Sequence, residues 1–209
     1  MTPTLVFGSG GHAGVIKDAI EASSNQHLLG LVVESGLGEA HENTAVFFES
    51  ELLSTYETIE FECIIGVGDG NRRLQLAEKI RKILPDVSFA IVKHPLANQL
   101  SRSTIGPGSF VAAGATVGVR AQIGEQVLIN TNASVDHDTE IEDYCSIGPN
   151  VAIGGNAVIK HGAFIGIGAT ILPGIQVGSN SIVGAGAVVV NDVPANQLVV
   201  GVPARVVKR

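Results

Sequence analysis

An aliphatic residue returns at every sixth position between Ile105 and Val189, and the place four residues later is small or compact in nearly every unit. A six-residue period matches neither the 3.6-residue turn of an α-helix nor the two-residue alternation of a strand. The stretch is therefore interpreted as a repeat before any single helix or strand is assigned.

Three six-residue units close a triangular coil of eighteen residues, if each unit forms one short strand and one corner. Five such coils, with neighbouring strands about 4.8 Å apart, predict a prism roughly 24 Å tall. β-Branched residues suit the inward positions because they are stiff at χ1, while Gly and Asn tolerate corner dihedral angles. The predicted walls are Ile105, Ile123, Ile141, Ile159 and Val177; Val111, Ile129, Ile147, Ile165 and Val183; and Val117, Val135, Ile153, Ile171 and Val189.

A small α/β unit is predicted ahead of the repeat. Short apolar strands alternate with helical patterns, which favours a small parallel sheet flanked by helices, that is, a Rossmann-like domain. We expect this domain over residues 1–95 and the prism over residues 96–209. The expected strands are Thr4 to Phe7, Leu28 to Val33, Cys63 to Val67 and Phe89 to Val92, and the expected helices are Val15 to Ala22 and Arg72 to Leu84.

Glycines follow the first predicted strand and precede the first predicted helix. Such a turn lets a phosphate approach the backbone and the helix N-terminus, although a tight turn without a ligand has the same sequence. The domain is half of a dinucleotide-binding unit, so a mononucleotide or nucleotide-sugar is favoured over NAD. An acidic residue about twenty positions on is placed to bind a ribose. The candidate acceptor-binding residues are Gly10, Gly11, His12, Glu34, Ser35 and Gly68.

Composition excludes several classes of function. The net charge of −7 offers no basic surface for nucleic acid, and no run of eighteen apolar residues predicts a membrane span. The N-terminus lacks the pattern of a signal peptide, and Cys63 and Cys145 are too few for a disulfide framework. A cytoplasmic protein with reduced thiols is therefore expected.

The GSGGHAG loop, the GVGDGNRR segment, the six-residue repeat and the GVPAR sequence occur together. In this the chain resembles the hexapeptide-repeat sugar acetyltransferases related to the bacillosamine-pathway and perosamine N-acetyltransferases and to sialic acid O-acetyltransferase. The resemblance implies a left-handed parallel β-helix and acetyl-CoA as cosubstrate, without a metal. It also implies a nucleotide-sugar acceptor, a homotrimer with active sites between subunits, and a role in cell-surface polysaccharide biosynthesis.

His137 is the best candidate for a general base, because it lies two places after the inward Val135 and so should project outward. An ordinary surface histidine is the alternative. The resemblance makes it the catalytic histidine, followed by Asp138 where the bacillosamine-pathway enzyme has Glu. Asp is shorter, so Asp136 competes for the same ring nitrogen. Asn130 matches a family residue near the base, or is a solvent-facing corner residue.

Gly155 lies eighteen residues after His137, so its N–H is a candidate oxyanion donor one coil further on. The resemblance assigns acetyl-CoA contacts to Ser146, which replaces a family histidine, and to Ile167 and Ala185. Cys145 occupies an inward compact position, which argues against an acyl-enzyme.

The sequence thus predicts an acetyl-CoA-dependent N-acetyltransferase acting on a nucleotide-linked aminosugar by direct transfer. O-Acetylation of a free sugar such as sialic acid is the nearer alternative. A metal-dependent protein like the γ-type carbonic anhydrases is the more distant one, although only His137 and His161 lie on the predicted prism. The nucleotide and the sugar are not encoded in a recognisable motif.

Overall fold

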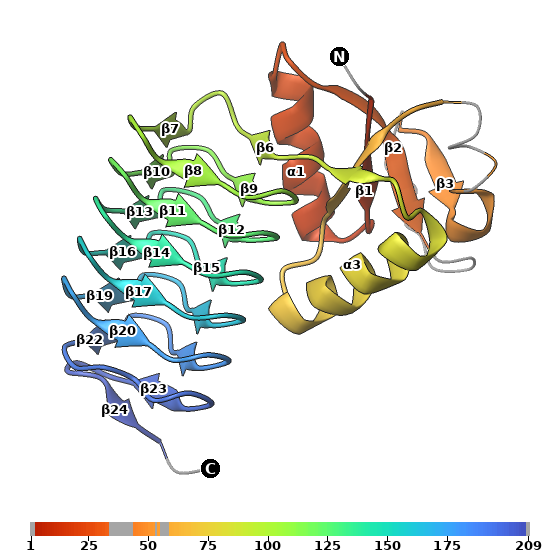
Figure 1. Cartoon of the computed structure of the whole chain (residues 1–209). Coiled ribbons are helices and arrows are strands. Elements are labelled where there is room, and N and C mark those ends of the chain that lie inside the picture. Colours follow the sequence, from red (N-terminus) through yellow and green to blue (C-terminus); the bar gives the residue numbers. More distant parts are fainter. Residues whose placement is uncertain (1–2, 34–43, 53, 55–58, 208–209) are drawn as a thin grey trace.

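The structure is a computed structural model that describes residues 3–33, 44–52, 54 and 59–207. A small α/β unit lies beside the upper coils of a β-strand prism, and the C-terminus lies at the opposite end of the prism (Figure 1). The prism is a left-handed parallel β-helix, so the predicted fold is confirmed for both parts of the chain.

The α/β unit is built on a five-stranded parallel sheet in the order β3-β2-β1-β4-β5. Five of the six expected elements appear with boundaries shifted by a few residues. The strand β3 and the 3₁₀ turn η1 were not anticipated. The elements are β1 (Pro3–Phe7), α1 (Gly11–Ala22), β2 (His27–Val33), β3 (Val46–Phe48), η1 (Glu49–Glu51), β4 (Glu62–Ile65), α3 (Gly70–Ile83) and β5 (Ser88–Phe89).

Helices α1 and α3 pack on opposite faces of this sheet. Helix α3 covers the face that carries Leu5 and Ile65, through Ala77 and Ile80. Helix α1 covers the other face, and its buried residues join one apolar cluster with Phe110 and Leu128 of the prism. Helix α1 is therefore enclosed between the sheet and the prism, which places the glycine loop at the junction of the two units.

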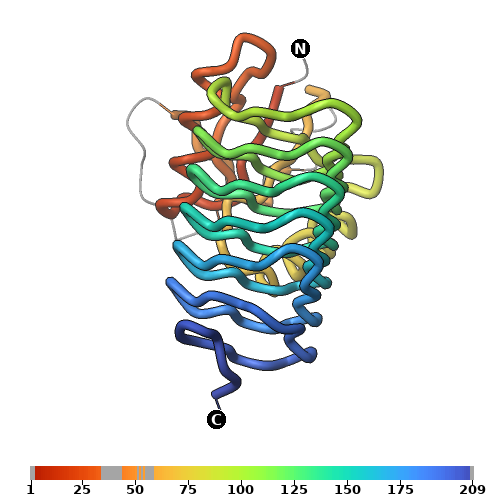
Figure 2. The backbone as a smooth tube through the Cα atoms, turned by 90° about the vertical axis from the view of Figure 1, so that its left-hand side faces the viewer, coloured from red at the N-terminus to blue at the C-terminus, as the bar shows by residue number. Residues whose placement is uncertain are grey.

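The prism has three walls of parallel strands, stacked with a register of eighteen residues (Figure 2). Wall I contains β6 (Val92–Lys93), β9 (Phe110–Val111), β12 (Leu128–Ile129), β15 (Ser146–Ile147), β18 (Phe164–Ile165), β21 (Ile182–Val183), β23 (Leu198–Val200) and the antiparallel β24 (Arg205–Val206). Wall II contains β7 (Asn98–Gln99), β10 (Thr116–Val117), β13 (Ser134–Val135), β16 (Ala152–Ile153), β19 (Thr170–Ile171) and β22 (Val188–Val189). Wall III contains β8 (Thr104–Ile105), β11 (Gln122–Ile123), β14 (Glu140–Ile141), β17 (Val158–Ile159) and β20 (Gln176–Val177).

The predicted three-wall register is confirmed strand by strand. The inward aliphatic residues and the compact residues four places later form one continuous buried core. Many corners need a positive φ, and Asn132, Asn150, Asn156 and Asn180 adopt it at 56–57°. Asn tolerates this region because its short polar side chain bonds locally. The corners, and not the strands, are therefore where side chains of different chemistry can be presented.

Two expectations were wrong, one about the junction between the two units and one about the length of the prism. Residues 89–92 do not form one strand, because Phe89 ends β5 in the α/β sheet whereas Val92 begins β6 in wall I. The prism is also longer than five coils, since β6 and β7 precede Ile105 and β23 follows the last six-residue unit. Within the described ranges, no helix is long and apolar enough to cross a membrane.

Candidate active site

His137 lies at the corner that follows β13, between wall II and wall III. Its side chain is 51% exposed, and it borders a groove of about 620 Å³ along wall II. Leu100, Val119, Leu172 and Pro173 give this groove an apolar lining. The His137 side chain therefore points outward, as its position in the six-residue repeat predicts.

The carboxylate of Asp138 contacts the ring, with its Oδ2 2.8 Å from Nδ1 of His137. The left-handed backbone of Asp138, at φ 57°, brings this short side chain beside its neighbour. Asp136 instead accepts a hydrogen bond from the backbone N–H of His137 at 2.7 Å. Of the two competing carboxylates, Asp138 is thus the one on the ring nitrogen.

Arg120 forms a two-point contact with the same carboxylate. Its Nε lies 2.6 Å from Oδ1 of Asp138 and its Nη2 lies 2.7 Å from Oδ2. The hydrogen bond from Arg120, followed by that from His137, holds the pKa of Asp138 at about 2. Asp138 is consequently an anion at any pH near neutrality.

Gly155 lies directly against the ring of His137 from the next coil. A Cβ atom on Gly155 would lie 2.6 Å from Cε1 and 2.7 Å from Nε2 of His137. The φ of Gly155 is not positive, so its lack of a side chain provides space and not backbone freedom. No hydrogen bond from the N–H of Gly155 occurs within the described residues.

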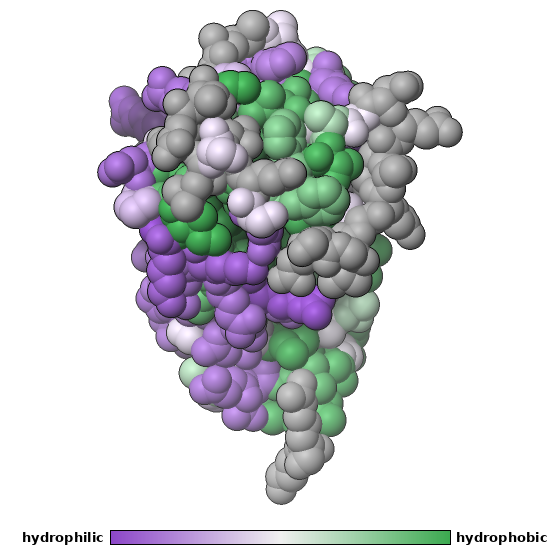
Figure 3. Space-filling view, turned by 90° about the vertical axis from the view of Figure 1, so that its right-hand side faces the viewer, coloured by the Kyte–Doolittle hydropathy of each residue, from purple (hydrophilic) through white to green (hydrophobic). Residues whose placement is uncertain are grey.

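Four further predicted residues lie together on wall I, away from His137. Asn130, Ser146, Ile167 and Ala185 line a mostly apolar cleft of about 410 Å³, and Gly68 of the α/β unit closes one side. Phe164, which is also exposed, lines the same cleft. Figure 3 shows an apolar area on the lower part of this face, beside a hydrophilic one. This cleft and His137 lie at opposite ends of the strands of wall II.

Asn130 thus lines a different cavity from the groove that His137 borders. Its Oδ1 accepts hydrogen bonds from the N–H and the hydroxyl of Thr131, at 2.9 and 3.4 Å.

Ser146 is tied to the α/β unit. Its hydroxyl donates to the carbonyl of Gly68 at 3.0 Å and accepts from Arg73 at 2.9 Å. The only hydroxyl proton is thereby used, so Ser146 has no donor left for a ligand.

Arg73 is fully buried and joins the two units, and none of its hydrogen-bond partners within the described residues is a carboxylate. Its guanidinium donates to the carbonyls of Val67 and Gly68 on one side and to those of Gln126, Tyr144 and Cys145 on the other. Burial lowers the pKa of Arg73 to about 10, which leaves it charged at neutral pH. Arg73 thus fixes the loop at Gly68 against the prism.

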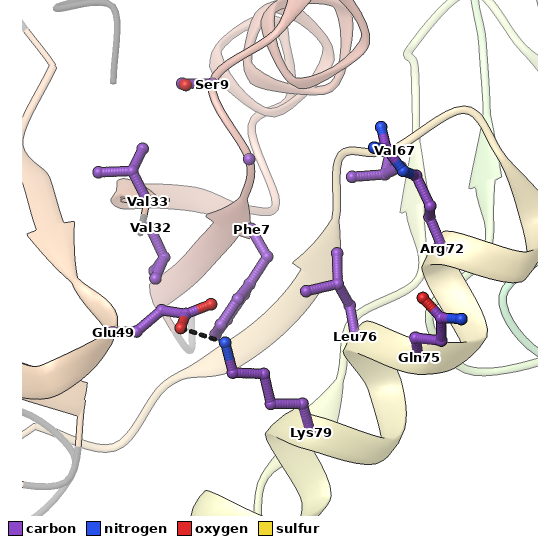
Figure 4. Close-up of a pocket in the computed structure, with 11 residues that line it drawn as sticks. Phe7, Ser9, Val32, Val33, Glu49, Val67, Arg72, Gln75, Leu76 and Lys79 are labelled. Carbon is purple, nitrogen blue, oxygen red and sulfur yellow. Dashed lines mark hydrogen bonds and ion pairs between the residues drawn. The ribbon is translucent and has the colours of Figure 1, made fainter. Parts of the chain in front are cut away.

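A second cavity, of about 430 Å³, opens at the carboxyl ends of β1, β2 and β4 (Figure 4). This is where ligands bind in parallel α/β sheets. Phe7, Val33 and Leu76 supply apolar walls, while Arg72 and Lys79 of α3 bring positive charge. Lys79 also pairs with Glu49 at 2.5 Å.

The glycine loop lies at the edge of this cavity. A Cβ atom on Gly10, Gly11 or Gly68 would meet no atom within 4 Å, so the chain's own packing does not require glycine there. His12 packs edge-on against Phe110 at 5.7 Å, and burial, followed by Arg73, lowers its pKa to about 4. Glu34 and Ser35 lie outside the described residues.

The thiol of Cys145 is buried in the prism core, and burial raises its pKa to about 12. It is therefore a compact apolar side chain, as its position in the repeat predicts. His161 packs on Tyr144 at 5.6 Å, near wall III. No group of three or more His, Cys, Asp or Glu that could hold a metal occurs in the described part of the chain.

Sequence reasoning missed Arg73, Arg120 and the cavity residue Lys79. Arg120 had a usable signal, because it precedes Asp138 by one eighteen-residue coil. Arg73 and Lys79 had none beyond their place in a basic amphipathic helix, where most such residues face solvent.

Two families match the chain. "PglD N-terminal domain" matches residues 4–80, and "Bacterial transferase hexapeptide (six repeats)" matches residues 120–155 and 156–191. No curated protein sequence matches the chain significantly.

Solved structures of sugar acetyltransferases match over the whole chain. A histidine-to-alanine mutant of GDP-perosamine N-acetyltransferase from Caulobacter crescentus, in complex with CoA and GDP-perosamine, is 30% identical with a TM-score of 0.92. That match covers 100% of this chain and 98% of the other. The acetyltransferase domain of PglB from Neisseria gonorrhoeae, in complex with acetyl coenzyme A, is 29% identical, with a TM-score of 0.88 and 98% of both chains covered. WeeI from Acinetobacter baumannii is 25% identical, with a TM-score of 0.86, 99% of this chain covered and 100% of the other.

Proposed function

The chain belongs to the hexapeptide-repeat sugar acetyltransferases that carry a PglD N-terminal domain, and on this premise we propose that it acetylates the amine of a nucleotide-linked aminosugar. The acetyl donor is acetyl-CoA and His137 is the general base. The observation that carries the proposal is the outward ring of His137, held at Nδ1 by Asp138 and lying against Gly155.

The acceptor binds to the α/β unit. Its nucleotide occupies the cavity at the carboxyl ends of β1, β2 and β4, where Arg72 and Lys79 attract the diphosphate. The N-terminus of α1 adds backbone N–H groups and a favourable dipole for the same charge. The open space at Gly10 and Gly11 leaves their backbone accessible to a ligand. The match to a protein crystallised with GDP-perosamine, whose sugar carries an amine, supports this class of acceptor.

Acetyl-CoA binds in the apolar cleft of wall I. Ile167 is 53% exposed there, and an uncovered aliphatic side chain of this size is suited to contact the pantetheine chain. Asn130 lies in the same cleft and can direct its amide toward the thioester. The neighbours crystallised with CoA and acetyl coenzyme A support this donor.

The active site forms between two copies of the chain, in a homotrimer. The separation of His137 from the cleft within one chain supports this arrangement, because one copy's base must meet the next copy's donor. The repeated heterologous contact closes into a ring. The apolar groove along wall II, beside His137, is a surface that such a contact would cover.

The chemistry is direct transfer. As the acceptor nitrogen attacks the thioester carbonyl, Nε2 of His137 takes a proton from that nitrogen, and Asp138 stabilises the resulting imidazolium. The N–H of Gly155 donates to the tetrahedral oxyanion. When the C–S bond breaks, the imidazolium returns the proton to the CoA thiolate. Cys145 takes no part, because its thiol is buried.

The test pairs kinetics with calorimetry. In His137→Ala, kcat should fall by about three orders of magnitude, while the affinity for acetyl-CoA stays near that of the wild type. Normal turnover by this variant would end the assignment. A panel of UDP-, GDP- and dTDP-linked aminosugars, together with hydroxyl acceptors such as free sialic acid, identifies the substrate; preference for a hydroxyl would replace N-acetylation by O-acetylation.

A further inference from the structure

Arg120 lies one coil before Asp138 and donates hydrogen bonds to both oxygens of its carboxylate. The two N–H···O contacts are short and parallel, in the forked geometry that a guanidinium makes with a carboxylate. One of these oxygens, Oδ2, also faces Nδ1 of His137 at 2.8 Å. The arginine and the imidazole therefore share one carboxylate oxygen.

This arrangement restricts a side chain that is otherwise free to turn. The carboxylate of Asp rotates over a broad range at χ2. A single hydrogen bond to the imidazole leaves that rotation, and the tilt of the ring, poorly defined. Two contacts from Arg120 remove the rotation and keep Oδ2 directed at the ring. The hydrogen bonds from Arg120 also lower the pKa of Asp138.

The fold itself does not require arginine at this place. Equivalent corners, eighteen residues apart, hold Arg102, Arg120, Asp138, Asn156 and Gly174, all with positive φ. Arg102 adopts φ 60° and Arg120 φ 59°, but the residue eighteen places after Arg102 is Arg120, whereas the residue eighteen places after Arg120 is the acidic Asp138. An exposed ion pair contributes little to stability, so the contact of Arg120 with Asp138 points to a role other than folding.

We propose that Arg120 is a positioning residue for acetyl transfer: it fixes the Asp138 carboxylate, which in turn orients the His137 ring toward the acceptor nitrogen. The proposal rests on the proposed function of His137. It explains how Asp138, one methylene shorter than Glu, holds the His137 ring. The left-handed backbone of Asp138 brings its carboxylate within reach of the ring, and Arg120 fixes the orientation of that carboxylate.

The test compares Arg120→Ala, Arg120→Gln and Arg120→Lys with Arg102→Ala, the matched control in the same column of corners. His137→Ala is measured beside them. Each variant is assayed for kcat, for KM of acetyl-CoA and of the best acceptor, for thermal midpoint and for oligomer size. Arg120→Gln keeps a side chain of similar length without the charge or the fork, and it carries the test if Arg120→Ala does not fold.

In Arg120→Ala and Arg120→Gln, kcat should fall by about tenfold or more at nearly unchanged KM and thermal midpoint, since a misplaced ring costs rate and not binding. Arg120→Lys should recover part of the loss, because it restores the charge without the fork. Arg102→Ala should match the wild type.

Wild-type kcat in Arg120→Gln beside an inactive His137→Ala would overturn the role of Arg120 and leave the proposed function intact. A raised KM for acetyl-CoA at unchanged kcat would also overturn it, because Arg120 would then be a substrate contact. An active His137→Ala would overturn the proposed function itself.

Discussion

Replacing Gly155 by Ala tests the geometry around the base most sharply. The new Cβ would lie 2.6 Å from Cε1 and 2.7 Å from Nε2 of His137, whereas carbon atoms in contact lie about 3.5 Å apart. The ring must therefore withdraw by about 0.9 Å. Its Nδ1 is held at 2.8 Å by Asp138, so this movement must also disturb that hydrogen bond.

A displacement of this size should lower kcat by about a hundredfold. The KM for acetyl-CoA should stay within about twofold of the wild type, because the ring adds to the rate and not to uniform binding. The release of CoA thiol measures turnover continuously, and a thermal melt with gel filtration establishes that the variant is folded and assembled.

Gly174→Ala is the matched control, at an equivalent corner of the following coil. Its φ of 72° makes alanine strained, but a Cβ there meets no atom within 4 Å. It should lose about 1 kcal/mol of stability and keep its kcat. If a folded Gly155→Ala turns over like the wild type, the ring of His137 does not act from the position that the structure gives it.

Three further predictions concern stability and reactivity. Burial keeps His12 neutral in the folded protein with a pKa of about 4, whereas the same side chain takes up a proton below about pH 6.5 in the unfolded chain. The contribution of His12 to the free energy of unfolding is therefore intact above pH 6.5 and is lost as the pH falls toward 4, with a loss of about 2 kcal/mol at pH 5. Urea unfolding of His12→Asn should lack that part of the pH dependence. Replacing Arg73 by Leu leaves buried carbonyls unpaired and should lower the free energy of unfolding by more than about 3 kcal/mol. Arg72→Leu on the same helix should change the free energy of unfolding by less than about 0.5 kcal/mol. Equal losses in the two variants would contradict the bridging role of Arg73. Burial raises the pKa values of Cys63 and Cys145, so Ellman's reagent should label neither thiol in the native protein and both in urea.

The prism was predictable because a repeat carries its own register. Whether Val135 faces inward and His137 outward depends only on their phase in a six-residue unit, and eighteen residues set the pairing of every wall. The same arithmetic placed Gly155 beside His137. No long-range information is needed when each coil contacts only the next.

The junction between the units was not predictable in the same way. Arg73 lies in a helix of basic pattern, yet it is fully buried, because most of its acceptors are backbone carbonyls, up to 72 residues away. Carbonyl groups have no sequence signature, so no pattern could identify them. The hydrogen bond from the Ser146 hydroxyl to the carbonyl of Gly68 was not predictable for the same reason.

The separation of Asn130 from His137 had a signal that went unused. The two residues are seven positions apart, so one strand of wall II lies between their corners. Phase in the repeat alone therefore indicates that they belong to different edges of the prism. The residue types of Asn130 and His137 suggested that both belong to one site. Their spacing indicates that they occupy different edges of the prism.

The most direct test of a site shared between subunits is complementation between two inactive variants. One variant carries His137→Ala, and the other carries Ala185→Trp, which fills the cleft of wall I. When the two chains are co-assembled in equal amounts, a site is complete only where an intact His137 meets a neighbour's intact cleft, so random closed rings should recover about one quarter of wild-type activity. If base and cleft served the same site within one chain, every subunit would carry a defect, and the mixture would stay inactive.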